Sequence, residues 1–193
     1  MNHVFVLEEI GKDEEHNAVI KERRNGQGAE VAGVTVEGKV AYLSLVQLQA
    51  GVTWQKSHYT RPEKWSKDSS VPAEKRIFRT PDWYGYFTAT YSPVKPLNIA
   101  LSGTYTGSMI VQHMKGYIPK DMAVTTPDFF DMNLKISYDF SLYKFITLQL
   151  NAGVQNIFNA YQRDFDQGKE RDSGYIYGPS MPRSYFAGAK LMF

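Results

Sequence analysis

The histidines and aspartates of this chain are the residues whose types could hold a metal ion or transfer protons. The pairs Asp128 and Asp131, and Asp164 and Asp166, have no nucleophile or base near them in the sequence. Cysteine is absent, which excludes thiolate ligands, disulfides and a cysteine nucleophile. The sequence therefore predicts no metal site, no cofactor and no enzymatic activity. The histidines lie in unrelated segments and lack the paired spacing of metal ligands: His3, His16, His58 and His113.

Long polar stretches of the chain carry chemistry that is better suited to binding than to catalysis. They contain aromatic rings and charged groups, which are means of noncovalent recognition, and loops commonly carry such sites. The alternative is that the same side chains pack the loops on one another. The residues that we expect to contact a ligand are Arg61, Trp65, Arg163, Asp164, Arg171, Tyr175 and Tyr177.

The elements between these stretches alternate strictly between apolar and polar residues. In the segment 146–154, the even positions are apolar and the odd positions are polar or small. This period of two predicts β-strands with one apolar face. Residues 2–9 fit the end of a further strand, which makes about eight strands and no helix of usable length. The alternating segments are 32–40, 46–56, 83–92, 97–109, 130–140, 146–154 and 184–193.

Connections of two lengths follow one another along the chain. Short ones fall at 41–44, 92–96 and 141–144. A connection of intermediate length is expected near 10–17. Tight turns at one end of a sheet and long loops at the other are the layout of an outer-membrane barrel. The long polar connections cover roughly 59–81, 111–128 and 159–182.

Composition alone does not distinguish a soluble sheet from a membrane sheet. The net charge is +2, which gives no reason to expect nucleic acid as a partner. The mean hydropathy of −0.40 suits either class, because only alternate residues of a barrel strand meet lipid. A soluble sandwich also alternates apolar and polar residues. The choice between them therefore depends on strand length and on the positions of the aromatic residues.

Both of these features favour lipid. The alternating segments are about 9–13 residues long, enough to cross a tilted bilayer, whereas soluble strands cluster near ~5–6 residues. Aromatic residues gather near segment ends, as in the two interfacial girdles of a membrane barrel. The sequence thus predicts an all-β fold, an antiparallel up-and-down transmembrane β-barrel segment that forms an incomplete barrel and an open curved sheet. The expected girdle residues are Trp83, Tyr84, Tyr86, Tyr138, Phe140, Tyr143, Phe158, Tyr161, Tyr185 and Phe193.

The end of the chain resembles the C-terminus of a TonB-dependent receptor. In that family the penultimate strand commonly ends in a Val-x-Asn-Leu-Phe-like run, and the last strand opens with Pro-Arg-x-Tyr and closes on Phe. Ile157 stands where the family usually has Leu. Segments 30–140 resemble the family more loosely, and their amino-acid sequence is most like that of receptors from Bacteroidetes-type bacteria. The matching residues are Val154, Asn156, Ile157, Phe158, Pro182, Arg183, Tyr185 and Phe193.

The resemblance implies a role in transport across the outer membrane of a Gram-negative bacterium. Such receptors have about 22 strands around a plug domain. They import siderophore–iron, cobalamin or glycans with energy passed on by TonB. Residues 1–193 would be the C-terminal part of such a barrel, lacking the plug and the earlier strands, so that TonB would act only through the missing plug. The expected partners are outer-membrane lipid, the remaining strands and plug of the full receptor, and the barrel-assembly machinery, which would read Tyr185, Leu191 and Phe193 as an assembly signal.

A self-contained eight-stranded barrel with a structural or adhesive role is the alternative, because eight strands can close. The first residues lack the basic and apolar regions of a signal peptide, and the first strand begins midway. We therefore expect the chain to be incomplete at its front, which favours the receptor over the small barrel. Pairing of the last strand with an N-terminal strand would favour the small barrel, and an open sheet would favour the receptor.

Overall fold

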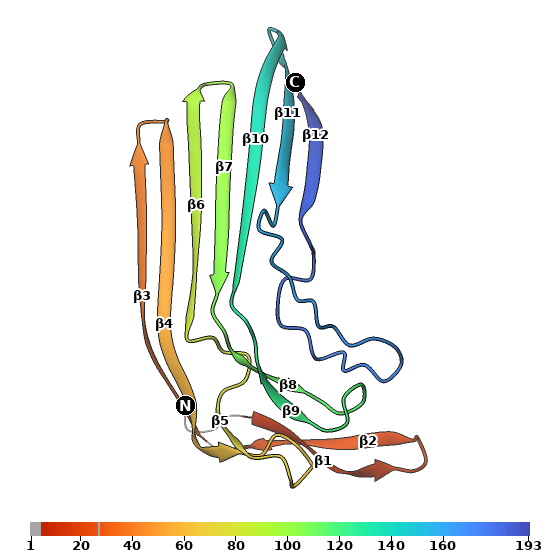
Figure 1. Cartoon of the computed structure of the whole chain (residues 1–193). Helices are drawn as coiled ribbons and strands as arrows, with labels where there is room; N and C mark the ends of the chain where they lie inside the picture. Colours follow the sequence, from red (N-terminus) through yellow and green to blue (C-terminus); the bar gives the residue numbers. More distant parts are fainter. Residues whose placement is uncertain (1–4, 27) are drawn as a thin grey trace.

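The protein is an all-β chain, known here from a computed structural model that describes residues 5–26 and 28–193 (Figure 1). Within those ranges no helix is long and apolar enough to cross a membrane. The long strands are β3 (Ala29–Tyr42), β4 (Val46–Glu63), β6 (Trp83–Val94), β7 (Leu97–Thr106), β10 (Phe129–Tyr143), β11 (Ile146–Gln155) and β12 (Ser184–Met192). The remaining strands are β1 (Phe5–Asp13), β2 (Ala18–Asn25), β5 (Glu74–Arg76), β8 (Ile110–His113) and β9 (Met122–Thr125).

The long strands form one antiparallel up-and-down sheet in the order β12-β11-β10-β7-β6-β4-β3. Each of these strands pairs with the long strand before it and the long strand after it in the chain, and β5 adds a short pairing to β4. Among the described residues, β12 pairs only with β11, and β3 pairs only with β4. The sheet is therefore open, as the sequence predicted, and β3 and β12 are its two edges.

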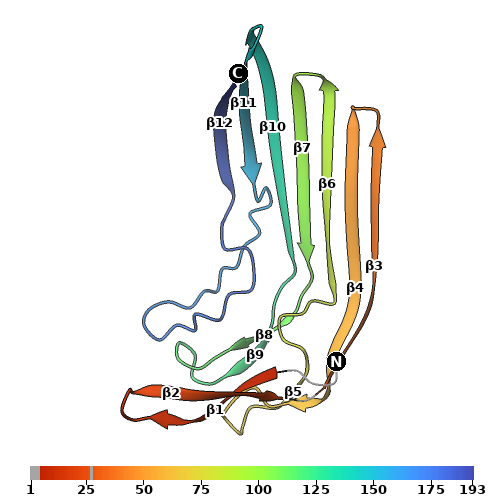
Figure 2. The same cartoon turned by 180° about the vertical axis from the view of Figure 1, so that it is seen from behind.

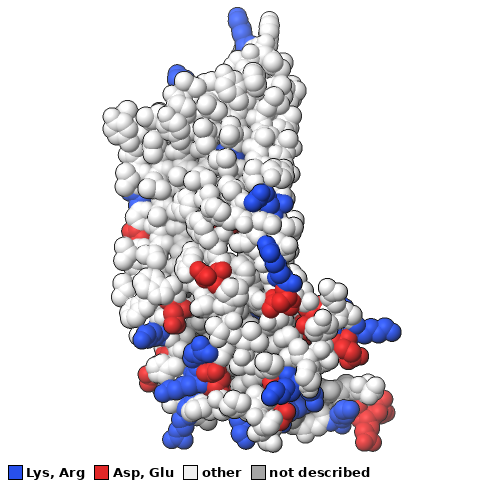
Figure 3. Space-filling model, viewed as in Figure 1, with Lys and Arg blue, Asp and Glu red and all other residues white. Residues whose placement is uncertain are grey.

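Tight turns lie at one end of the sheet and long connections at the other. The turns join β3 to β4, β6 to β7 and β10 to β11, and the C-terminus lies at the same end (Figure 1). The view from behind shows the long connections gathered at the opposite end, beside the β1–β2 hairpin (Figure 2). On the face seen in Figure 3, charged side chains cluster around these connections, and few are visible over the strands above them.

Register places the apolar positions of every long strand on one face. Opposite residues of an antiparallel pair lie on the same face. Leu101 is opposite both Ala89 and Leu134, and Leu134 is opposite Val154. On the other face, Ser137 is opposite Asn151. The alternation read from the sequence thus produces a continuous apolar face and a continuous polar face.

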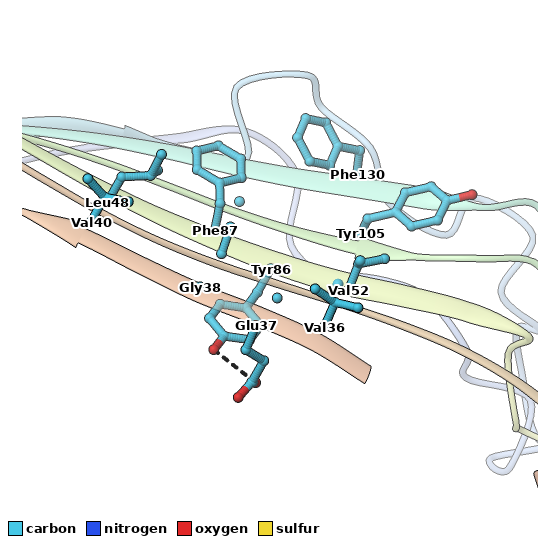
Figure 4. Close-up of a pocket in the computed structure, with 14 residues that line it drawn as sticks. Val36, Glu37, Gly38, Val40, Leu48, Val52, Tyr86, Phe87, Tyr105 and Phe130 are labelled. Carbon is cyan, nitrogen blue, oxygen red and sulfur yellow. Dashed lines mark hydrogen bonds between the residues drawn. The ribbon is translucent and has the colours of Figure 1, made fainter. Parts of the chain in front are cut away.

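A close-up of the sheet shows the two faces together (Figure 4). Phe87, Tyr105 and Phe130 project from the apolar side, where they border a shallow apolar groove. Tyr86 and Glu37 project from the polar side, and Tyr86 Oη donates a hydrogen bond to Glu37 Oε1 at 3.1 Å. The sequence-based assignment of Tyr86, and of Tyr84 beside Thr53, to an aromatic girdle was wrong, because both occupy polar-face positions.

Apolar side chains on the apolar face are widely exposed. Val36 and Val40 of β3 have exposed fractions of 63% and 66%, and Leu150 of β11 has 43%. A contiguous exposed apolar surface of this kind needs a covering partner or lipid. Most of the buried apolar residues lie instead at the loop end, for example Ile110, Val111 and Tyr175.

Two features of the strands differ from the sequence-based expectations. Residues 2–9 were expected to end a further wall strand, but β1 pairs only with β2 in a separate hairpin; residues 2–4 lie outside the described ranges. The connection expected near 10–17 is shorter than predicted, because β1 extends to Asp13 and β2 begins at Ala18. β4 and β10 run 18 and 15 residues, longer than predicted. β4 continues into the largely polar stretch that ends at Glu63, and β10 gains Phe129 at one end and residues 141–143 at the other.

Candidate ligand-facing loops

Three long connections fold together at the loop end of the sheet. They are the 64–82 connection with β5, the 107–128 connection with β8 and β9, and the 156–183 connection between β11 and β12. We call this unit the loop cluster. Its centre contains Val111 and Gln162, whose exposed fractions are 0% and 1%.

Arg79 ties the first connection to the other two. Its backbone N–H donates to the carbonyl of Ile110 at 2.8 Å. Its guanidinium donates to the carbonyl of Ile176 at 2.7 Å and also to that of Gly174. A planar guanidinium can serve two carbonyl groups at once, which suits it to joining separate segments.

His113 joins the second connection to the third. Its Nε2 lies 2.9 and 3.0 Å from the two carboxylate oxygens of Asp166, and both side chains are buried. Its ring stacks on Tyr175 with centroids 3.7 Å apart. Next to it, the backbone N–H of Met114 donates to Asp172 Oδ2 at 2.8 Å. The β8–β9 hairpin is therefore fixed to the long connection by charge-assisted bonds and by a stacked ring.

Asp164, Tyr175 and Tyr177 form a second cluster in the third connection. Tyr175 Oη donates to Asp164 Oδ2 at 2.8 Å, and Tyr177 Oη donates to Oδ1 at 2.5 Å. Burial raises the pKa of Tyr177 to about 12, with a further contribution from its bond to Asp164, and the same causes raise the pKa of Tyr175. Burial also acts to raise the pKa of Asp164, but the bonds from Tyr177 and Tyr175 outweigh it and hold that pKa below its usual value.

These pKa shifts predict that the folded structure of the third connection (156–183) loses stability at both acid and alkaline pH. The lowered pKa of Asp164 stabilises the fold above about pH 4, and this contribution is lost as the pH falls further. The raised pKa of Tyr177 stabilises it below about pH 10, and this contribution is lost as the pH rises towards 12. Near-ultraviolet circular dichroism against pH should show both limbs. Asp164→Asn should flatten the acid limb and Tyr177→Phe should reduce the alkaline one; profiles unchanged in both variants would contradict this assignment.

The two halves of the C-terminal motif meet in space. Asn156 is buried and has a φ of 51°, in the left-handed region. Its Nδ2 donates to the carbonyls of Ala160 at 3.0 Å and Met181 at 2.9 Å, and its Oδ1 accepts from the N–H of Ala160. Asn159 Oδ1 accepts from the N–H of Arg183 at 2.9 Å. Asn156 of the motif, together with Asn159, therefore holds the start of the connection against its end.

The other residues expected to contact a ligand are spread over the rim. Arg61 lies exposed near the end of β4. Trp65 donates from Nε1 to the carbonyl of Pro72 at 3.1 Å and packs edge-on against Phe78. Arg163 lies over the ring of Tyr161, and Arg171 donates to the carbonyl of Gly168. The fold brings Asp164, Tyr175 and Tyr177 together, whereas the contacts of Trp65, Arg163 and Arg171 described above lie within their own connections.

The residues expected to direct assembly all lie on the last strand or just after it. Tyr185, Leu191 and Phe193 are exposed, with Phe193 at 89%. Tyr185 and Leu191 are opposite Val154 and Leu148, so both belong to the apolar face.

Sequence reasoning missed the residues that hold the loops together. Arg79, Asp121 and Asp172 were not singled out, and His113 was interpreted as isolated. Asp121 accepts from Ser66 Oγ and from the N–H of Lys115, so it joins two connections. The partners lie far apart in sequence, and no local spacing marks them. His16 and His58 lie next to Asp13 and Glu30, and His3 lies outside the described residues. Among the described residues, no group of three or more potential ligands could hold a metal ion.

Comparisons with known proteins show the fold. No protein-family model matches the chain, and no curated protein matches it. The chain is similar to the ferric-catecholate import receptor Fiu from E. coli K12, with 20% identity and a TM-score of 0.57, covering 94% of this chain and 23% of Fiu. It is similar to FpvAI, solved in complex with pyocin S2, with 14% identity and a TM-score of 0.58. That match covers 90% of this chain and 20% of the other. It is also similar to a variant of the ferric enterobactin receptor PfeA from Pseudomonas aeruginosa, with 16% identity and a TM-score of 0.56. That match covers 99% of this chain and 27% of PfeA. The chain spans about a quarter of the length of these proteins, and it shares with that part of each an antiparallel up-and-down β-sheet.

Proposed function

We propose that residues 1–193 form the C-terminal part of the β-barrel of a TonB-dependent receptor in the outer membrane of a Gram-negative bacterium. The observation that carries the proposal is the continuous apolar face of an open sheet whose edges, β3 and β12, have no further partner among the described strands. A sheet in lipid must be closed, because unpaired backbone groups there are costly. Further strands of a larger barrel would satisfy both edges.

The height of the apolar face fits a bilayer. On β6, Trp83 and Tyr91 mark its two ends, and Trp83 pairs with Trp54 at a ring distance of 6.3 Å. The eight steps between Trp83 and Tyr91 span about 26 Å along the strand and about 20 Å once the strand is tilted by ~40°. The apolar band of a membrane barrel is about 25 Å tall. Outer-membrane lipid is therefore the proposed partner of this face.

The rest of the receptor supplies the other partners. The polar face would line the lumen and meet a plug domain, with Glu37, Lys39, Lys135, Asp139 and Lys190 on it, and TonB would act through that plug. The barrel-assembly machinery would recognise Tyr185, Leu191 and Phe193. An eight-stranded barrel of this chain alone is less well supported, since β12 does not pair with β1, β2 or β3.

The role of the loop cluster would be binding, without catalysis. Arg61, Trp65, Arg163, Arg171 and Tyr177 would face an imported ligand, and Asp164 and Tyr175 would support Tyr177. Siderophore–iron, cobalamin and glycans remain the candidate ligands. Ferric complexes should be tried first, because the similar proteins Fiu and PfeA are named for ferric compounds.

Single cysteines test the proposed topology, because the native chain has none. Ser70→Cys lies in a long connection and Lys95→Cys lies in a tight turn; both side chains are exposed. In intact cells a membrane-impermeant maleimide should label Ser70→Cys. It should label Lys95→Cys only after the outer membrane is permeabilised. Equal labelling of the two in intact cells would contradict the proposal.

A further inference from the structure

A groove of about 560 Å³ lies in the middle of the apolar face, over strands β3, β4 and β6 (Figure 4). Small residues form its floor. Gly38 and Ala50 are opposite each other in the β3–β4 ladder, and Gly85 lies on the next strand, β6. We call this depression the Ala50 groove. Larger apolar residues border it, among them Val40, Leu48, Val52, Phe87 and Tyr105.

A glycine on the neighbouring strand keeps the Ala50 groove open. Gly103 of β7 is opposite Phe87 of β6, and a Cβ on Gly103 would collide with the Phe87 ring. The ring therefore lies over Gly103 and leaves Ala50, its neighbour on the other side, uncovered. The Phe130 ring lies beyond it, with ring centroids 6.3 Å apart. The groove is thus built into the register of the sheet and does not depend on a loop.

Charge on this part of the apolar face lies at one end of the groove. Among the described apolar-face positions of β3, β4 and β6, it is confined to the loop end, at Glu30, Lys56 and His58. Trp54 and Trp83 lie between these charges and the groove, as interfacial aromatic residues do. Lys56 follows Trp54 by about 7 Å along the strand. It therefore lies at the depth of lipid headgroups.

Lys56 is the charge on this face that a ligand could use. Glu30 lies next to His58, with 3.4 Å between Glu30 Oε2 and His58 Nε2. On β5, Arg76 Nε lies 3.6 Å from Glu74 Oε1. Within the described part of the chain no ion pair involves Lys56, whose side chain is exposed. A lysine ammonium commonly binds phosphate, as a point charge.

The spacing between Lys56 and the groove fits a single lipid molecule. Val52, at the loop end of the groove, precedes Lys56 by about 13 Å along the strand. On a strand tilted by ~40° this separation is about 10 Å along the membrane normal. The headgroup region of one leaflet is about 5–8 Å deep. A phosphate bound by Lys56 therefore leaves an acyl chain of the same molecule at the depth of the groove.

A hydrocarbon chain with an anionic headgroup suits this surface better than a second copy of the chain. Inside a bilayer, association depends on close packing and on polar contacts, because apolar contact with lipid is equally favourable everywhere. An acyl chain would supply the packing in the groove, and a phosphate would supply the polar contact. Two copies related by an axis along the membrane normal would place their Lys56 ammonium groups at the same depth, where like charges repel.

We propose that the Ala50 groove and Lys56 together bind one lipid with a phosphorylated headgroup, from the leaflet beside the loops. The inference rests on the proposed function in one respect, which is that the apolar face meets lipid. It goes further, because ordinary contact with a bilayer would involve the whole face and would not depend on these particular residues.

Native mass spectrometry of the detergent-purified protein tests the proposal. One molecule of dipalmitoyl phosphatidate should bind in a saturable manner and more tightly than any further molecule. Dipalmitoylglycerol has the same chains without the phosphate, and it should bind at least about fivefold more weakly. Glycerol 3-phosphate has the phosphate without the chains, and it should not bind.

Two variants, each with a matched control, assign the site. Lys56→Gln should lower the affinity for phosphatidate to that for dipalmitoylglycerol. Lys39→Gln makes the same change on the polar face of β3, opposite Gln49, and should have no effect. Ala50→Phe should fill the groove and weaken binding of both lipids by about tenfold. Ala152→Phe makes the same change at an exposed apolar-face position of β11, and should leave binding unchanged.

Several results would overturn the proposal. They are equal binding of the two lipids, tight binding of glycerol 3-phosphate, and wild-type affinity in Lys56→Gln. A dimer that excludes phosphatidate would also do so, since a second copy would then cover the groove. Ala50→Val, a smaller change, replaces Ala50→Phe if that variant does not fold. The maleimide labelling that tests the topology involves neither Lys56 nor Ala50, so failure of the lipid site is distinguishable from failure of the proposed function.

Discussion

Replacing Leu150 by arginine should strongly destabilise the fold in lipid, whereas the same change at Asn151 should be tolerated. Leu150 lies in the middle of β11, on the apolar face between Tyr138 and Ala189. Asn151 is its neighbour in sequence but lies on the polar face, opposite Ser137 and Gly188. The two variants therefore add the same charge at the same depth and differ only in the face that receives it.

The expected difference follows from the cost of placing a charge in hydrocarbon. Arg near the bilayer midplane of a barrel costs about 2–4 kcal/mol on the lipid side. That free energy corresponds to a roughly 30- to 700-fold shift in the folding equilibrium. Urea titration of protein refolded into lipid vesicles should show a lower midpoint for Leu150→Arg alone. Similar midpoints for the two variants would mean that the apolar face does not meet lipid.

Replacing Asn156 by alanine should release the third connection from the sheet. Three side-chain hydrogen bonds within the connection would be lost, and alanine would be strained at the φ of 51°. Lost buried hydrogen bonds and a left-handed backbone together should cost about 2–4 kcal/mol. Urea unfolding would measure the loss, and hydrogen exchange at Ala160, whose N–H is bonded to Asn156, should accelerate.

Two further variants separate the causes of that loss. Asn17 has a similar φ of 48° but lies exposed in the β1–β2 turn, so Asn17→Ala should show the backbone strain without the buried bonds. Asn156→Gly accepts the backbone angle but loses the bonds, so it should retain most of the destabilisation. If Asn156→Gly were as stable as the wild type, the clamp between the motif halves would have no energetic role.

The sheet was largely predictable from the sequence, because its signal is local. Alternation such as that of 146–154 specifies both the strand and its faces, and a polar turn specifies the next antiparallel neighbour. The errors arose where that signal weakens. Tyr84 and Tyr86 were grouped with Trp83 by residue type, although the period of two places them on the opposite face. Residues 5–9 alternate too poorly to reveal that their partner is β2.

The loop cluster was not predictable in the same way. His113 and Asp166 meet only because β8 and the 156–183 connection fold over the same end of the sheet, and 52 intervening residues hide that contact. Asn156 was noticed as part of a motif, but its clamping role depends on Met181, whose carbonyl gives no sequence signal.

The bonds between the three connections also restrict how this end of the protein could be re-engineered. Arg79 donates to carbonyls of the third connection, and Asp172 of that connection accepts from Met114 in the second. If one connection were moved to another protein or exchanged for a foreign one, the Arg79 guanidinium and the Asp172 carboxylate would lose these hydrogen-bond partners. Engineering of the proposed ligand contacts would therefore have to exchange the three connections together, or be confined to exposed side chains such as Arg61 and Arg171.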